Sequence, residues 1–430
     1  MTAPVIGFAG MTHLGVNSAA AALARGFTVV GFDRHHAVVA GLSQGRAPVT
    51  EPGLEEILRE RQSNARFTAR TEELSRCDVV YISTDVATDD RGTSDLSGVR
   101  TLIETVAGVL RKDAILVVLC QVPPGFTRGL AFPPPERLYY QVETLVFGRA
   151  VDRALNPERF IVGCANPDAP LAPPYAAFLG AFGCPILPMR YESAELAKIA
   201  INCCLVASIS VANTLAELCE RIGAVWSEIA PALKLDKRIG QNAYLNPGLG
   251  IAGGNLERDL ATVARFAEEH GTDAGVVKAW VANSRHRRDW AARTIRSFVL
   301  DDRPDAVVGV WGLAYKENTH SIKNSPSLAT IAQLAGTTLR LHDPVVPASA
   351  ARHAKAVAAS DALDAAKGAD ALMILTPWPE YRQVDPVRLA AAMRGRIVLD
   401  PYAVLDAKAA VAAGLEVHTL GRGPMKPGNA

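Results

Sequence analysis

The first 33 residues constrain the fold more than any other part of the chain. An apolar run at 5–9 leads into Gly10-Met-Thr12-His-Leu-Gly15, and apolar residues at helical spacing follow over 16–25. A second apolar run at 28–32 ends at Asp33. A buried strand, a glycine-containing turn, a helix and a second strand that ends in an acid are typical of a dinucleotide-binding unit. We therefore expect an α/β chain that begins with a doubly wound, Rossmann-like parallel sheet.

The residues of this turn indicate the cofactor. Gly10 allows the tight turn and Gly15 allows the helix to pack closely on the strand, while Thr12 stands where a second glycine is usual. A Cβ at Thr12 crowds a bound pyrophosphate slightly, although the hydroxyl could hydrogen-bond it instead. Asp33 can accept hydrogen bonds from ribose hydroxyls and repels a 2′-phosphate, a preference that neighbouring Arg34 weakens a little. We expect NAD as cofactor, bound by Gly10, Thr12, Leu14, Gly15, Asp33 and Arg34.

Alternating strand and helix patterns divide the rest of the chain. Up to about residue 190 they predict strands at 79–83, 115–120 and 159–163, with a helix at 54–62 and a proline-rich irregular loop at 123–135. From 193 to about 298 only helical periodicity occurs, with helices expected from 195 towards 222, at 260–269 and at 274–298. Alternation returns at 306, and it predicts strands at 307–311, 338–342, 371–375, 397–400 and 415–419, and helices at 327–335 and 387–393.

We therefore expect two Rossmann-like doubly wound domains joined by a central all-helical domain. The predicted bounds are 1–192 for an NAD-binding domain, 193–299 for the helical domain, 300–420 for a second Rossmann-like domain and 421–430 for a flexible tail. The turn after the first strand of the second such domain, Gly312-Leu-Ala-Tyr-Lys316, lacks spaced glycines, so this domain requires no second dinucleotide. The long buried helix of the middle domain is a plausible dimer core.

Composition excludes several classes of function. The 430 residues carry a net charge of +1, which gives no reason to expect nucleic acid or an anionic membrane as partner. We find neither a signal-peptide pattern nor an apolar run that looks long enough to span a membrane. The cysteines are scattered apart from the adjacent pair Cys203 and Cys204, so they suggest neither a zinc site nor a disulfide framework. We expect a cytoplasmic enzyme.

Short motifs along the chain suggest a family. In order they include Glu51-Pro-Gly-Leu-Glu, Asp89-Asp-Arg-Gly92, Val122-Pro-Pro-Gly125, 194–202, Asp236-Lys-Arg238-Ile-Gly240, 248–259, 312–319, Ser325-Pro326, His342-Asp-Pro344 and 376–380. Over nearly its whole length the chain resembles the UDP-glucose/GDP-mannose dehydrogenase family, whose members oxidise nucleotide sugars. The resemblance implies a UDP- or GDP-linked sugar as substrate and a homodimer.

The resemblance also implies residue roles. Lys198 and Asn202 stand four residues apart, hence on one face of a helix, and could together stabilise an alkoxide or a developing oxyanion. Asp259 matches the family's catalytic carboxylate, which orders a water or serves as base; as a simple alternative, it could cap a helix that begins at Leu260. The implied substrate-binding residues are Lys198, Arg238 (from the neighbouring subunit), Tyr244, Gly248, Gly250 and Lys316.

At several positions the chain departs from the family. The family's active-site loop reads G-x-G-x-G-G-S-C-F-P-K-D, and Asn255 occupies the position of its nucleophilic cysteine. An amide nitrogen is no nucleophile at neutral pH. No obvious residue is therefore left to attack the sugar aldehyde and form the thiohemiacetal through which the family makes a sugar acid. Of two family glutamates, Glu143 is kept and Phe147 replaces the other. Near the cofactor, Gln121 replaces a threonine, Val86-Ala87 replaces a Thr-Pro pair, and Lys323 replaces an arginine.

These changes leave four functions open. The first is an NAD-dependent oxidoreductase that stops at an aldehyde or ketone. The second is an epimerase or dehydratase that keeps its NAD and takes the hydride back. The third is an acid-forming enzyme with another nucleophile, for which Cys203 and Cys204 lie beside Asn202 in the sequence, although adjacent helical residues point about 100° apart. The fourth is a non-catalytic homologue that binds a nucleotide sugar.

Overall fold

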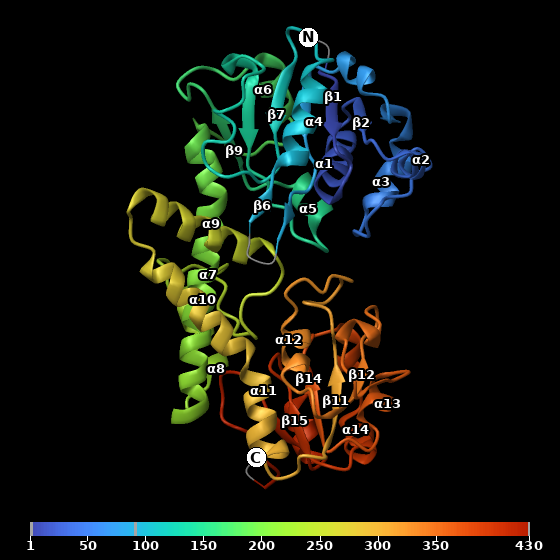
Figure 1. The fold of residues 1–430 in the computed structure, drawn as a ribbon, viewed down its shortest axis with the longest axis vertical. Helices are drawn as coiled ribbons and strands as arrows, with labels where there is room; N and C mark the ends of the chain where they lie inside the picture. Colours follow the sequence, from blue (N-terminus) through green and yellow to red (C-terminus); the bar gives the residue numbers. More distant parts are fainter. Residues whose placement is uncertain (1–2, 90–92, 429–430) are drawn as a thin grey trace. The chain divides into compact units, whose positions relative to one another are not determined.

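The computed structural model of the chain describes residues 3–89 and 93–428 (Figure 1). Its contacts form two compact units, the first ending at Ile201 and the second beginning at Asn202. This boundary falls inside one long helix, α7 (Tyr191–Ile222), and the two units are described separately. Of the Asp89–Gly92 motif, positions 90–92 lie outside the described residues.

The first unit is built on one sheet with the strand order β10-β9-β8-β7-β4-β1-β2-β3. Every pairing in it is parallel except that of β8 with β9. The strands are β1 (Ile6–Ala9), β2 (Val29–Phe32), β3 (Ala65–Thr68), β4 (Val79–Ile82), β7 (Ile115–Val118), β8 (Leu138–Gln141), β9 (Phe160–Cys164) and β10 (Ile186–Arg190). The short β5 (Ala87–Thr88) and β6 (Ser94–Asp95) pair separately. The expected doubly wound sheet is confirmed.

Burial explains why the sequence revealed most of these strands. All residues of β1, β2, β4 and β7 are buried, as expected for a parallel sheet that helices cover on both faces. The helices of this unit are α1 (His13–Ala24), α2 (His36–Leu42), α3 (Leu54–Glu60), α4 (Ser97–Ala107), α5 (Ala150–Leu155) and α6 (Pro173–Gly180). Small residues such as Ala19–Ala22 in α1 are buried, which lets that helix lie close to the sheet.

The middle of the chain is helical, as predicted, but its helix bounds differ. The helices are α7, α8 (Trp226–Leu235), α9 (Asn255–His270), α10 (Gly275–Arg288), α11 (Trp290–Ile295) and a π-helical turn η4 (Arg296–Leu300). The single helix expected at 274–298 is therefore wrong, because the chain breaks at Asp289. The expectation that no apolar run is long enough to span a membrane is also wrong, because α7 is long enough and apolar enough to do so. Core and interface helices of soluble proteins can have the same length and composition.

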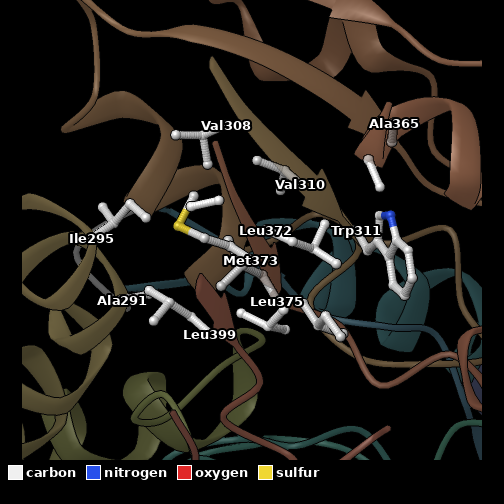
Figure 2. Close-up of a cluster of buried hydrophobic side chains, with 14 of the residues drawn as sticks. Ala291, Ile295, Val308, Val310, Trp311, Ala365, Leu372, Met373, Leu375 and Leu399 are labelled. Atoms are coloured by element: carbon white, nitrogen blue, oxygen red, sulfur yellow. The ribbon is translucent and has the colours of Figure 1, made fainter. Parts of the chain in front are cut away.

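The second unit ends in a parallel sheet with the order β13-β12-β11-β14-β15-β16, which is the 3-2-1-4-5-6 order of a Rossmann fold. Its strands are β11 (Val307–Trp311), β12 (Thr338–His342), β13 (Ala356–Ala358), β14 (Ala371–Ile374), β15 (Ile397–Leu399) and β16 (Glu416–His418). Figure 2 shows Val308, Val310, Leu372 and Met373 of the central strands with Ile295 in one apolar cluster. Helices α12 (Pro326–Ala332), α13 (Ala362–Ala366), α14 (Pro386–Ala392) and α15 (Ala407–Ala412) flank the strands in sequence.

The described part of the expected flexible tail is tied to the second unit. Met425 and Val417 exchange two backbone hydrogen bonds of 2.9 Å, and the Trp226 amide donates to the Gly421 carbonyl at 2.8 Å. Glu220 of α7 accepts a bond from the Gly421 amide at 3.1 Å. Residues 421–428 therefore contribute to the packing of this unit.

Asp343, directly after β12, holds the first turn of the second sheet. One carboxylate oxygen accepts hydrogen bonds from the amides of Leu313 (2.6 Å) and Ala314 (3.1 Å) and from Trp378 Nε1 (3.0 Å). The other oxygen accepts bonds from two amides of its own loop. Burial pushes the pKa of this carboxyl upwards, but the backbone N–H groups outweigh it, and the pKa lies below its usual value.

We predict that Asp343→Asn destabilises the protein by about 2 kcal/mol at neutral pH, because buried donors lose a charged acceptor. Since the folded pKa is lowered, the ionised Asp343 contributes stability above the usual aspartate pKa and loses it as the pH falls through the folded value. The variant should therefore also lose stability less steeply in acid. Urea unfolding at several pH values measures both effects, with the exposed Asp273→Asn as control. Equal unfolding free energies for Asp343→Asn and wild type would contradict this role.

Candidate active site

Two glycines shape the turn between β1 and α1. Gly10 has a φ of +96°, and a Cβ on it would lie 2.8 Å from Thr84 Cβ. A Cβ on Gly15 would lie 1.9 Å from the Gly10 carbonyl oxygen. Neither position accepts a side chain without a backbone shift, because such a contact is far below van der Waals distance. The turn thus has the geometry that brings the N-terminus of α1 close to a bound phosphate.

Thr12 has a structural role that the sequence did not reveal. Its hydroxyl accepts a hydrogen bond from the Asp85 amide at 2.9 Å and donates to the Ser83 carbonyl at 3.4 Å. The side chain therefore ties the turn to the segment after β4, where half-buried Val86 lies. A bond from this hydroxyl to pyrophosphate would have to replace the one to Ser83.

Asp33 is 7% exposed and held in place by the backbone. Its two carboxylate oxygens accept hydrogen bonds from the amides of Met11 and His35, each at 2.9 Å. Each oxygen keeps a lone pair, so a ribose hydroxyl can still bind. Arg34 is exposed, and its Nε lies 3.3 Å from His35 Nε2. With Gly10 and Gly15, this carboxylate fits a dinucleotide that lacks a 2′-phosphate.

Lys198 and Glu143 lie together in the first unit. Lys198 Nζ of α7 is 3.9 Å from a carboxylate oxygen of Glu143, which follows β8, and the two side chains are only 12% and 21% exposed. The Glu143 carboxylate also accepts a hydrogen bond from the Leu145 amide. Lys198 is therefore no ordinary surface lysine, and a cation is held close to a carboxylate.

Glu195 lies within the 194–202 motif, and the sequence analysis gave it no role. It is fully buried on α7, and its carboxylate accepts hydrogen bonds from the amides of Gly125 at 2.6 Å and Thr127 at 2.9 Å. Burial raises the pKa of Glu195. These bonds hold the Val122–Gly125 turn, which directly follows half-buried Gln121. An acid one helical turn before Lys198 in an apolar helix was the available signal.

In the second unit, Asn202 and Asp259 form a buried pair. Asn202 Nδ2 donates to Asp259 at 2.5 Å, and the residues are 8% and 1% exposed. Arg258 Nε lies 3.4 Å from the other Asp259 oxygen and is itself buried, a contact that the sequence analysis missed. The helix-cap interpretation of Asp259 is wrong, because α9 begins at Asn255 with Gly254 as its cap. Asp259 is thus a buried carboxylate with an amide and a guanidinium beside it.

Asn255 opens α9 and is exposed. It stands four residues before Asp259, so both belong to the same face of the helix. The loop before it is fixed: Asn324 Nδ2 donates to the Gly253 carbonyl at 2.9 Å and also to Glu257. Position 255, which the resemblance matches to the family's cysteine, therefore follows an anchored loop, and this match stays a prediction.

The loop that contains Gly248 and Gly250 is held by hydrogen bonds, and its conformation requires a glycine at position 250. The Gly248 amide donates to Asn213 Oδ1 at 2.9 Å. Gly250 has a φ of +73°, and a Cβ there would lie 2.4 Å from the Ser284 carbonyl oxygen. The Ile251 amide donates to Ser284 Oγ at 2.8 Å. The expected substrate loop is thus anchored to α7 and α10.

The remaining predicted site residues of the second unit lie on loops. The Arg238 side chain is 89% exposed and forms a two-bond ion pair with Asp236, at 3.0 and 2.6 Å. Tyr244 is 51% exposed, and Lys316 Nζ lies 5.6 Å from the centre of the Tyr315 ring. Half-buried Lys323 lies beside Gly254. Arg238 is expected to bind the substrate of the neighbouring subunit, and its role stays a prediction, as do those of Tyr244 and Lys316.

Cys203 is a poor substitute for the missing nucleophile. Burial raises the pKa of its thiol, and the Asp259 carboxylate raises it further. The thiolate is the reactive form, so this environment suppresses reactivity. Cys204 is exposed on the neighbouring face of α7.

Comparisons with known proteins agree with this geometry. The chain matches three models of the UDP-glucose/GDP-mannose dehydrogenase family: the NAD-binding domain over residues 4–172, the central domain over 192–285 and the UDP-binding domain over 309–407. These matches support NAD as the cofactor. They correspond to the three predicted domains, although the central match begins one residue before the predicted start at 193, and the domain boundaries stay predictions.

Among similar proteins, UDP-glucose 6-dehydrogenase of Pseudomonas aeruginosa is 32% identical over 91% of both chains. UDP-glucose 6-dehydrogenase TuaD of Bacillus subtilis is 26% identical over 96% of this chain and 92% of its own. The solved structure of a UDP-glucose dehydrogenase from Pyrobaculum islandicum is 27% identical with a TM-score of 0.82, covering 94% of this chain and 95% of that one. The chain belongs to the UDP-glucose/GDP-mannose dehydrogenase family and is an enzyme of the nucleotide-sugar dehydrogenase type.

Proposed function

We propose that the chain is a cytoplasmic, NAD-dependent oxidoreductase that converts one hydroxyl of a nucleotide sugar to a carbonyl and stops there. The observation that carries the proposal is Asn255, an exposed amide at the first residue of α9, where the family has its nucleophile. Formation of an acid from an aldehyde through a thioester requires a thiol at that point. The similar proteins named as UDP-glucose 6-dehydrogenases make UDP-glucose the first substrate to test.

The retained residues support chemistry at a hydroxyl. Oxidation of an alcohol removes a proton from oxygen and a hydride from carbon, so the site needs a base and a group that stabilises negative oxygen. The Lys198 ammonium and the Asn202 amide can donate to that oxygen. Asp259, which accepts from Asn202 at 2.5 Å, can take the proton directly or through a water. Bound NAD supplies the hydride acceptor.

The lost residues support a halt at the carbonyl. Phe147 stands where the family has a second glutamate, and a phenyl ring can neither orient nor deprotonate a water. The raised pKa of Cys203 lowers its thiolate fraction and disfavours it as an alternative nucleophile. Both features disfavour the conversion of a carbonyl product to an acid.

We predict that Asp33→Asn weakens NAD binding by about 2 kcal/mol, or roughly 30-fold in Kd, because hydrogen bonds to a charged acceptor are the stronger ones. The asparagine oxygen can keep only part of the bonding to Met11 and His35. Calorimetric titration with NAD measures the change, and Arg34→Ala, at an exposed neighbour, is the control. Unchanged affinity in the asparagine variant would remove Asp33 from the cofactor site.

A second test follows the reaction. With UDP-glucose and NAD, the wild type should form one NADH per sugar and a carbonyl product that hydroxylamine traps. Lys198→Ala should slow NADH formation by at least about 100-fold without changing NAD affinity, since it removes a donor to the oxyanion. Exposed Lys112→Ala is the matched control. Two NADH per sugar and an acid product would refute the proposal, whereas tightly retained NAD with a rearranged sugar and no net NADH would favour the redox-neutral alternative.

We also propose that the chain forms a homodimer through α7. Four large apolar residues of this helix are 39–63% exposed, and their spacing of four, three and four places them on one stripe: Val211, Leu215, Leu218 and Ile222. A stripe of this kind on a 32-residue helix is typical of a helix that packs against another. A second copy presents the same stripe, which makes a two-fold interface self-complementary.

We predict that Leu218→Glu weakens the dimer at least tenfold, because it places a charge without a partner in an apolar interface. Sedimentation over a range of concentrations measures the dissociation. Val387→Glu is the control, since Val387 is 65% exposed on α14 of the C-terminal sheet. A wild type that is monomeric, or a Leu218→Glu dimer of undiminished strength, would contradict the interface.

A further inference from the structure

Glu51 joins two segments of the first unit that are far apart in sequence. Its side chain is fully buried, and its carboxylate lies 2.8 Å from His13 Nε2 and accepts hydrogen bonds from the amides of Gly148 (2.9 Å) and Ala150 (3.2 Å). A buried carboxylate depends on such partners, so these contacts fix its position. Because a carboxylate here can only accept, Nε2 carries the proton. His13 opens α1 directly after the cofactor turn, and Ala150 opens α5.

A ring contact makes a second connection between the same segments. The His13 ring stacks on Phe147, with centroids 4.0 Å apart and planes at 27°. The Asn17 side chain donates to the His13 carbonyl at 2.7 Å, which also restrains the backbone of this residue. A glutamate at position 147, as in the family, could not stack on the His13 ring. This chain uses an aromatic contact at that point instead.

The segment that these contacts hold also carries Glu143. At its other end, Lys198 Nζ lies 3.9 Å from the Glu143 carboxylate, and Arg153 Nε of α5 donates to the Thr144 carbonyl at 2.7 Å. Residues 142–145 form one wall of a cavity that is also lined by Ser18 of α1 and Phe178 of α6. Since that wall faces a cavity, the segment has room to shift within the otherwise close-packed unit.

We propose that His13, Phe147 and Glu51 are positioning residues that couple occupancy of the cofactor turn to the placement of Glu143. An anion bound at the first turn of α1 is held by backbone N–H groups beside His13. The turn then loses freedom, and the stacked ring and the buried carboxylate pass this restraint to residues 147–150. Glu143 is thereby confined when the cofactor is present. The inference rests on the proposed function only in taking NAD as the ligand of the turn.

Hydrogen exchange of the full chain, with and without NAD, tests the coupling. In the wild type, saturating NAD should slow exchange of the amides at 144–150 by about fivefold or more, within the usual range of coupling between sites. His13→Gln keeps a donor for Glu51 but loses the ring, and Phe147→Leu changes a side chain that is 45% exposed, so both variants should fold. In both, the NAD effect on 144–150 should fall below about twofold while Kd for NAD changes less than about threefold.

Two further variants make the result specific. Phe147→Tyr, unlike Phe147→Leu, keeps a ring at this position and should keep the protection by NAD. A general loss of packing at position 147 would not produce this difference between the two variants. His36→Ala, at an exposed histidine of α2, should behave as wild type. Undiminished protection in His13→Gln and Phe147→Leu, or wild-type NAD binding that leaves 144–150 unchanged, overturns the coupling alone. A wild type that binds no NAD overturns the proposed function as well.

Discussion

The close approach of α1 to the end of β1 is the constraint on which the cofactor region depends. A single methyl group on Gly15 would lie 1.9 Å from the Gly10 carbonyl oxygen, so only glycine lets the helix start where it does. That start brings Met11 to Asp33, Thr12 to the segment after β4 and His13 to Glu51. The turn is thus a junction of several loops as well as a phosphate-binding element.

The second Rossmann-like sheet has a similar glycine turn after its first strand, but the aspartate beside this turn has a structural role. Gly312 has a φ of +94°, and a Cβ on it would lie 2.4 Å from Thr376 Cβ, much as Gly10 meets Thr84. Asp343 occupies the place that Asp33 has in the first sheet. Within the described residues, Asp33 accepts hydrogen bonds from two backbone amides, whereas the Asp343 oxygens accept four from backbone amides and one from Trp378, which leaves little room for a ribose. The same topology therefore supports a binding turn in one unit and a structural turn in the other.

Sequence patterns located β1, β2, β4 and β7, whose residues are all buried and form continuous apolar runs. Among the strands of the two large sheets they missed β3, β10 and β13, whose residues are partly or largely exposed, and β8, which is buried but follows three consecutive prolines. They also merged α10 and α11, since helical periodicity continues across the break at Asp289. The start of α9 at Asn255 escaped as well, because glycine caps a helix without the side-chain signal that sequence reasoning uses.

The sequence alone determined the fold class, the cofactor and the family, because these depend on residue types at fixed spacings: Gly10 and Gly15 before a helix, Asp33 after a strand, and collinear motifs such as Asp236-Lys-Arg238-Ile-Gly240. Only the tertiary structure decided how the candidate site residues are held. Glu195 supports a turn about 70 residues earlier in the chain, Arg258 flanks Asp259, and Glu51 joins His13 to Gly148. Such contacts join residues far apart in sequence, and no local pattern records which buried charge will meet which donor.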